Sequence, residues 1–232
     1  MSRRIIIFGV LLAGLGTVQV RGQNLIVNGN FETGTFAGWT ADDEAGGGGS
    51  WYISTPGATT PLSGEPTAHN ASGGNYYALI DETAPGCQVL LQSFTLASAA
   101  TLTLSYQMFV NSAAGLHDTG TLDYKVSPNQ FGQVDLLTGT ATPFSTAAAD
   151  IVQTFYSGLD QPQNINAYTS YTFTILSLAA GTYQLRFAAV ENQDTLNMGV
   201  DNVSLAAVPE PTTLVLVGLS GLSVLLFRRQ RK

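Results

Sequence analysis

The chain has 232 residues, 44% of them hydrophobic, and its 16 acidic and nine basic side chains give a formal net charge of −7. Seven of the nine basic residues lie close to the two ends. Between Gln23 and Val208 only Lys125 and Arg186 are basic, against 15 acidic residues, which gives a net charge of about −13. Such a surface repels phosphate groups, and this excludes nucleic acid as a partner.

The first 22 residues have the pattern of a secretion signal peptide. A short basic segment, MSRR, precedes the apolar run Ile5–Leu15, and a polar stretch follows up to Gly22. The run has the length of a secretory h-region and is short for a membrane span, which argues against the alternative of an uncleaved membrane helix. We therefore expect a signal helix over residues 1–22 that the general secretion machinery recognises, with cleavage leaving Gln23 as the new N-terminus.

The next part of the chain is expected to supply large apolar groups to a core. Val27, Phe31 and Trp39 are separated by Asn-Gly and Thr-Gly turns, which can fold them back onto one face. The acidic, glycine-rich stretch 42–49 most simply forms a solvated, flexible loop. Cys87 is the only cysteine, so no intramolecular disulfide can form. It is expected to be a small buried strand residue, with a reactive thiol or an intermolecular link as alternatives.

Apolar and polar side chains alternate in several interior stretches. The alternation is longest over residues 101–110, recurs over 171–175 and 182–189, and is shorter over 122–126. A period of two predicts half-buried β-strands, and no interior stretch has helical periodicity over a useful length. Residues 127–150 lack a clear period and are predicted to form a long loop with one or two strands.

Turn signals such as Asn28-Gly29 and Ala180-Gly181 separate the predicted strands. Many strands punctuated in this way are typical of a sandwich or barrel, and the length left between the two ends suits one hydrophobic core. We predict an all-β fold, a single jelly-roll-type antiparallel β-sandwich over residues 23–207. The N-terminal signal helix and a C-terminal transmembrane helix are predicted to flank it.

Two segments carry a resemblance to a known superfamily. NLIVNGNFETG at residues 24–34, followed by a Gly-Trp pair, resembles the opening strand and loop of the carbohydrate-binding-module-like jelly rolls of the galactose-binding superfamily. GVDNVSL at residues 199–205 is similar to the last strand of that fold, and residues 74–79 and 91–94 fall where the family has inner strands. The resemblance implies a fold more than a ligand.

The same resemblance implies a structural calcium ion, held near the first and last strands by carbonyl groups and acidic side chains. Glu32 and Asp201 are the residues that match, and hard oxygen ligands suit calcium. The sequence has no dense cluster of ligands, however. A simple edge-strand turn at Asp201-Asn202 is therefore the alternative.

No motif for catalysis is found. The sequence has no Gly-x-Ser-x-Gly elbow and no phosphate-binding glycine motif. His69 and His117 lack metal-ligand spacing and are expected to be solvated loop residues. We therefore predict no enzymatic activity and no catalytic residues.

The C-terminal part, residues 208–232, has three components in a fixed order. Val208 precedes the motif Pro209-Glu210-Pro211, which is followed by the apolar stretch 212–227 and the basic tail RRQRK. The two prolines keep the chain extended and delay the start of the helix. The apolar stretch predicts a short transmembrane helix, and its basic tail is expected to stay in the cytoplasm.

This order of components resembles the PEP-CTERM sorting signal, which implies recognition by an exosortase, a membrane peptidase that cuts near the Pro-Glu-Pro motif. A plain tail anchor with a proline-rich stalk is the alternative. The resemblance implies an exported protein that is anchored in the membrane for a time through its C-terminal helix. It would then be found at the cell surface or in the extracellular medium.

Export and the jelly-roll resemblance together suggest a non-catalytic surface or matrix protein that binds polysaccharide. Sugar binding needs exposed aromatic rings, and five candidates lie outside the strongest alternation: Trp51, Tyr52, Tyr76, Tyr156 and Tyr168. One alternative is a purely structural matrix component without a defined ligand. A secreted hydrolase is the other, and it would need two carboxylates about 5 to 9.5 Å apart in a cleft.

Overall fold

The computed structural model describes residues 22–64, 73–160 and 167–208, and these form ten strands without a helix. The strands are β1 (Thr40–Asp43), β2 (Ser50–Ser54), β3 (Tyr77–Glu82), β4 (Gly86–Leu96), β5 (Ala100–Ser112), β6 (Phe131–Thr138), β7 (Ile151–Gly158), β8 (Thr169–Leu178), β9 (Gly181–Glu191) and β10 (Leu196–Ala207). The predicted signal helix, the transmembrane helix and the Pro209-Glu210-Pro211 motif lie outside the described residues. Within the described ranges, no helix is long and apolar enough to cross a membrane.

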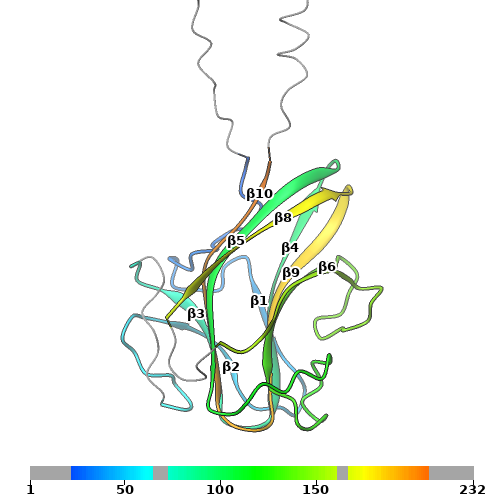
Figure 1. Ribbon diagram of the computed structural model, residues 1–232. Coiled ribbons are helices and arrows are strands. Elements are labelled where there is room, and N and C mark those ends of the chain that lie inside the picture. Colours follow the sequence, from blue (N-terminus) through cyan, green and yellow to red (C-terminus); the bar gives the residue numbers. More distant parts are fainter. Residues whose placement is uncertain (1–21, 65–72, 161–166, 209–232) are drawn as a thin grey trace, which may run out of the picture. The chain divides into compact units, whose positions relative to one another are not determined.

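The strands make two five-stranded antiparallel sheets that pack face to face (Figure 1). The first sheet has the order β1-β4-β9-β6-β7, and the second has the order β2-β3-β10-β5-β8. Consecutive strands often belong to different sheets, so the chain crosses repeatedly from one layer to the other. The prediction of a jelly-roll-type β-sandwich is confirmed.

The core lies between the two sheets and follows from the alternation in the sequence. In β5 the alternate residues from Leu102 to Val110 are buried and belong to the central cluster. Inward residues of β9, such as Leu185 and Phe187, meet them from the first sheet. Full burial of a side chain of this size contributes about 1.5–3 kcal/mol, so the alternating strands supply most of the driving force for folding.

The segment before β1 folds onto the end of this core. Phe31 and Trp39 are buried as predicted, with ring centroids 5.5 Å apart, and the Trp39 indole N–H donates to the carbonyl of Asn28 at 3.2 Å. Val27, in contrast, is 62% exposed, so its predicted place in the core is wrong. Its backbone N–H and C=O are both hydrogen-bonded to the Gln92 side chain, and this pairing leaves the valine side chain facing solvent.

The strand predicted at residues 122–126 does not form, although Leu122 is buried. The buried side chain of Asn129 donates to the carbonyls of Thr121 and Asp123, and the Asp123 carboxylate accepts from the N–H of Lys125. Side chains thus supply the hydrogen bonds that a strand ladder would have supplied, which favours a turn.

Three other predictions concern single residues or loops. Cys87 is fully buried in β4, as predicted. The region 127–150 contains one strand, β6, and a long connection after it. His117 lies in a loop, where its backbone pairs with Gln130, and His69 lies outside the described residues.

The two ends of the domain lie side by side. Asn24 forms a bridge with Ala206, and the N–H of Leu25 donates to the carbonyl of Leu205 at 2.7 Å. The closing segment 199–205 lies in β10, the central strand of the second sheet, as the resemblance implied. The chain therefore enters and leaves the domain at one place.

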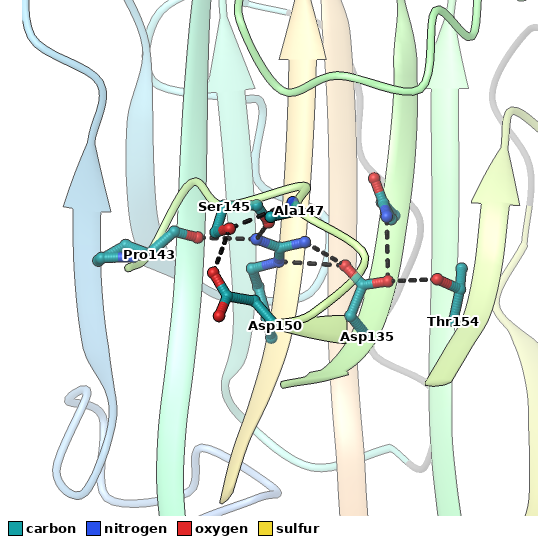
Figure 2. Close-up of polar contacts among 8 residues, drawn as sticks. Asp135, Pro143, Ser145, Ala147, Asp150 and Thr154 are labelled. Atoms are coloured by element: carbon teal, nitrogen blue, oxygen red, sulfur yellow. Dashed lines mark hydrogen bonds and ion pairs between the residues drawn. The ribbon is translucent and has the colours of Figure 1, made fainter. Parts of the chain in front are cut away.

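A buried ion pair fixes the long connection after β6 against the first sheet (Figure 2). The guanidinium of Arg186 binds the carboxylate of Asp135, and it also donates to the carbonyls of Pro143 and Ser145 at 2.9 and 2.8 Å. The other oxygen of Asp135 accepts from Thr154 at 2.8 Å. Because every nitrogen of the guanidinium and both oxygens of the carboxylate have a hydrogen-bond partner, this cluster has the character of a structural anchor.

Candidate functional site

The five aromatic residues singled out from the sequence do not gather on one surface. Trp51 is 4% exposed and belongs to the core between the sheets, so its ring packs the interior and cannot stack on a sugar. Tyr168 is mostly enclosed by Tyr77 and Phe109, with ring centroids 6.0 and 5.0 Å away. These two candidates therefore lie in different clusters.

Tyr52 and Tyr76 are both partly exposed, but they have separate surroundings. Tyr52 lies on the edge strand β2, near the carboxylates of Asp81 and Asp43. Tyr76 packs over Gly34, where a Cβ atom would approach the tyrosine ring to 3.4 Å.

Tyr156 lies at the open edge of the sandwich, where β7 ends the first sheet and β8 ends the second. The register of β6 and β7 shifts between Val134 and Asp135, which leaves Phe155 as an extra residue. Such a bulge turns two successive side chains toward the same face. Phe155 and Tyr156 consequently both pack against the core, and the half-buried tyrosine reaches the surface.

A stack of rings continues from this edge into the core. The Tyr171 ring lies 5.6 Å from Tyr156 in an edge-to-face contact, and 5.1 Å from the fully buried Tyr106 in a stacked one. Phe173 lies nearly parallel to Tyr171, at 6.5 Å and 6°. Aromatic contacts of this kind add about 0.5–1.5 kcal/mol each beyond burial, so the exposed ring faces are held rigidly.

Asp160 completes this constellation. Its carboxylate accepts from the backbone N–H of Val110 at 2.7 Å and from the Tyr156 hydroxyl at 3.3 Å. Burial raises the pKa of the Asp160 carboxyl, while the hydrogen bond from Val110 opposes that shift. Burial and the nearby Asp160 charge raise the pKa of Tyr171. We call Tyr156, Asp160 and Tyr171, all half-buried, the edge site.

The edge site combines two chemical abilities. The partly exposed rings of Tyr156 and Tyr171 offer apolar faces, and Asp160 offers a carboxylate acceptor beside them. Apolar surface with a few convergent polar groups is what small-molecule and sugar sites require. Sequence reasoning found Tyr156 alone. It placed Tyr171 in a strand and gave Asp160 no role, because their proximity depends on which strands lie at the sheet edges.

Glu32 and Asp201, the pair implied for calcium, are engaged within the protein. The Glu32 carboxylate accepts from the backbone N–H groups of Asn75 and Tyr76 at 2.8 and 3.1 Å, and the hydrogen bond from Tyr76 lowers the pKa of Glu32. Asp201 is almost fully buried, and its carboxylate accepts from the N–H of Asn202, a residue with a positive φ at a register shift of β10.

The described ranges contain no group of three or more His, Cys, Asp or Glu side chains that could hold a metal ion. The Glu32 oxygens already accept hydrogen bonds from amide groups, and Oδ1 of Asp201 stabilises the turn that was the alternative interpretation. Both carboxylates are thus engaged by backbone N–H groups.

The comparison with protein-family models found the PEP-CTERM protein-sorting motif at residues 207–232. The chain carries a PEP-CTERM sorting signal. This match confirms the resemblance drawn from the Pro-Glu-Pro motif, the apolar stretch and the basic tail. The motif covers the C-terminal end and does not describe the β-sandwich, and no curated protein matches the chain.

Solved structures that are similar to this chain include several carbohydrate-binding modules. TmCBM61 in complex with beta-1,4-galactotriose is 12% identical, with 80% of this chain and 99% of that chain covered and a TM-score of 0.49. A CBM4 structure is 18% identical, with 78% and 99% covered and a TM-score of 0.40. The enzymatically active domain of tailspike protein 4 from bacteriophage CBA120 is 11% identical, with 79% of this chain covered and a TM-score of 0.49. Only 21% of that tailspike chain is spanned.

Proposed function

We propose that this protein is exported and sorted by an exosortase to the cell surface or the extracellular matrix, where its β-sandwich binds polysaccharide without catalysis. The sorting motif at residues 207–232 is the observation that carries the first part. The exosortase would cut near Pro209-Glu210-Pro211, after the secretion machinery has removed residues 1–22. The C-terminal helix would anchor the chain in the membrane until that cut.

The edge site supports the second part of the proposal. A pyranose ring presents an apolar C–H face to an aromatic ring and hydroxyl groups to an acceptor. Tyr156 and Tyr171 would supply the rings, and Asp160 would accept a hydrogen bond from a sugar hydroxyl. A rigid aromatic pair costs little conformational entropy on binding, which favours recognition by stacking.

Binding to immobilised polysaccharides tests this proposal. The full chain, purified in detergent, would be passed over a panel of neutral and acidic polysaccharides. We expect at least one to retain the wild type, and Tyr171→Ala to weaken that binding about tenfold or more, as truncation of a central aromatic contact does. Tyr124→Ala is the matched control, because Tyr124 is also half-buried but lies in the loop before β6. Equal binding by both variants would remove the edge site from the proposal.

A purely structural matrix component is the second candidate. Its support is the dispersal of the other aromatic candidates, since Trp51 lies in the core and Tyr168 in a separate cluster. If the wild-type protein binds none of the polysaccharides, the result favours the structural function over polysaccharide binding. Among the described residues, the Asp160 carboxylate accepts from the Val110 N–H and the Tyr156 hydroxyl, an arrangement that suits an acceptor for a sugar hydroxyl better than one member of a catalytic carboxylate pair.

A further inference from the structure

Two short connections cross one end of the sandwich side by side. Residues 83–85 lead from β3 in the second sheet to β4 in the first, and residues 192–195 lead from β9 in the first sheet to β10 in the second. Each connection begins after a glutamate: Glu82 ends β3 and Glu191 ends β9. The two crossings, with Glu191, line a pocket of about 250 Å³.

The strand registers place these two glutamates close together. Glu191 pairs with Gly86, the first residue of β4 after the crossing that begins after Glu82. In the same way, Glu82 pairs with Leu196, the first residue of β10 after the crossing that begins after Glu191. Along β3 and β9, the preceding residues on the same faces, Ile80 and Ala189, belong to the core between the sheets. Both carboxylates therefore point inward, beneath the crossings.

Gln88 joins them from β4. It is fully buried, and its neighbour on the same face, Leu90, belongs to the central core. Its side-chain N–H donates to the carbonyl of Gly48. Gly49, which follows Gly48, packs directly against Glu82: a Cβ atom at Gly49 would lie 2.5 Å from Cγ of Glu82. The glycine-rich loop thus packs over the cluster and does not extend freely into solvent, contrary to the expectation from the sequence.

The cluster is rich in hydrogen-bond acceptors that lack a donor. Both carboxylate oxygens of Glu82, Oε2 of Glu191 and Oε1 of Gln88 are buried and have no hydrogen-bond partner. Glu82 itself is fully buried. If the two carboxyl groups shared one proton, one oxygen would donate a hydrogen bond and another would accept it. The other two of the four atoms would still have no hydrogen-bond partner. Unpaired polar atoms in such a place are costly.

We propose that a calcium-class divalent cation binds between Glu82 and Glu191, with Oε1 of Gln88 as a neutral ligand. One divalent ion would balance both carboxylate charges and would give all four unpartnered oxygens a partner. Hard oxygen ligands, carboxylate and amide, are those that Ca²⁺ prefers, and backbone carbonyls or water would complete its six to eight ligands. The pocket between the crossings, lined by Glu191, is the route of entry.

This site is distinct from the pair Glu32 and Asp201. Glu32 binds the backbone of Asn75 and Tyr76, which precede β3, whereas Glu82 is the last residue of that strand. An extended strand of six residues separates them by roughly 15–20 Å. The two sites can therefore be tested independently.

Thermal unfolding of the full chain in detergent, with calcium or with a chelator, is the first test. We expect calcium to raise the melting temperature of the wild type, and the double variant Glu82→Gln with Glu191→Gln to lose that response. Glu32→Gln should keep it. A response that survives in the double variant, or that disappears in Glu32→Gln, overturns the proposal. A wild type with the same melting temperature in calcium and in chelator overturns it as well.

Terbium luminescence gives a second test that does not depend on the folding of the double variant. Trp51 in β2 pairs with Ile80 and is buried in the core, close to Glu82 on the neighbouring strand. We expect Tb³⁺ bound to the full chain to emit on tryptophan excitation, to be displaced by Ca²⁺, and to lose most of its emission in Trp51→Phe. Trp39→Phe is the matched control. No emission, or an equal loss in both variants, overturns the placement of the ion.

Discussion

The guanidinium of Arg186 and the carboxylate of Asp135 form an ion pair with no exposed surface on either side chain. They come from neighbouring strands, since Asp135 in β6 is directly paired with Arg186 in β9. Each also holds a further part of the first sheet: the arginine holds the connection after β6, and Asp135 holds β7 through Thr154. One pair thus joins three segments.

Removing one partner of this pair should be strongly destabilising. Arg186→Met leaves the Asp135 carboxylate buried without its cation, and we expect a loss of about 3–5 kcal/mol in the free energy of unfolding. Urea unfolding monitors the change. Lys125→Met is the control, because the Lys125 side chain is 62% exposed and its ion pair with Glu44 should contribute less than about 1 kcal/mol. Similar losses in both variants would contradict a structural role for Arg186.

Truncation of the two aromatic residues in β2 should distinguish a core residue from a surface residue by the loss in the free energy of unfolding. Trp51→Ala opens a cavity between the sheets and is expected to cost about 3–5 kcal/mol in the free energy of unfolding. Tyr52→Ala, one residue further on the edge strand, should cost much less, because Tyr52 keeps part of its ring in solvent. Chemical denaturation of the full chain measures both. A larger effect at Tyr52 would contradict the assigned faces of β2.

Gly49 is predicted to be intolerant of a side chain for two separate reasons. It has φ +87°, and a Cβ atom would lie 2.5 Å from Cγ of Glu82. Gly64 has φ +70° with open space around it. Gly64→Ala therefore reports the backbone cost alone, about 1 kcal/mol, and Gly49→Ala should cost clearly more in thermal or urea unfolding. Equal costs would indicate that the loop can move away from Glu82.

The stability of the domain in chelator should decrease as the pH rises. Burial and their mutual repulsion raise the pKa of the Glu82 carboxyl well above its ordinary range, and burial raises that of Glu191 to about 8. Raised pKa values mean that the folded state binds protons that the unfolded state releases, so the stabilising protonation is complete below pH about 4.5 and is lost toward pH 8. Glu191→Gln should flatten this dependence, measured as urea midpoints across the range. An unchanged slope would contradict the assignment.

Much of the sandwich could be predicted from local patterns, because a half-buried strand must alternate. Residues 101–110 have that alternation, and they form most of β5. The pattern fails at 122–126, where Asn129 supplies hydrogen bonds from outside the segment. It also fails at Val27, whose backbone is held by Gln92, a residue 65 positions away. Both errors arise from side-chain hydrogen bonds that come from outside the segment and that periodicity does not encode.

The sites depend still more on such contacts. Tyr156 turns toward the open edge because of a bulge in β7, and Tyr171 meets it there only because β7 and β8 end the two sheets on the same side. Glu82 resembles a surface residue in the sequence, since acidic residues at a strand end are ordinarily solvated. Its burial follows from the second crossing, which comes more than a hundred residues later in the chain.

The position of β10 has a mechanical consequence. It is the last strand of the domain, yet it lies between β3 and β5. Its residues Leu196–Val200 pair with β3, and the ladder with β5 continues to Ala207. Tension applied along β10 at its C-terminal end would load the bonds of the β5 ladder together in shear, with those of the β3 ladder at the start of the strand, and would not peel them apart one by one. Under the proposed sorting and polysaccharide binding, a load between the C-terminal end of the domain and a bound polymer would thus fall on this central strand.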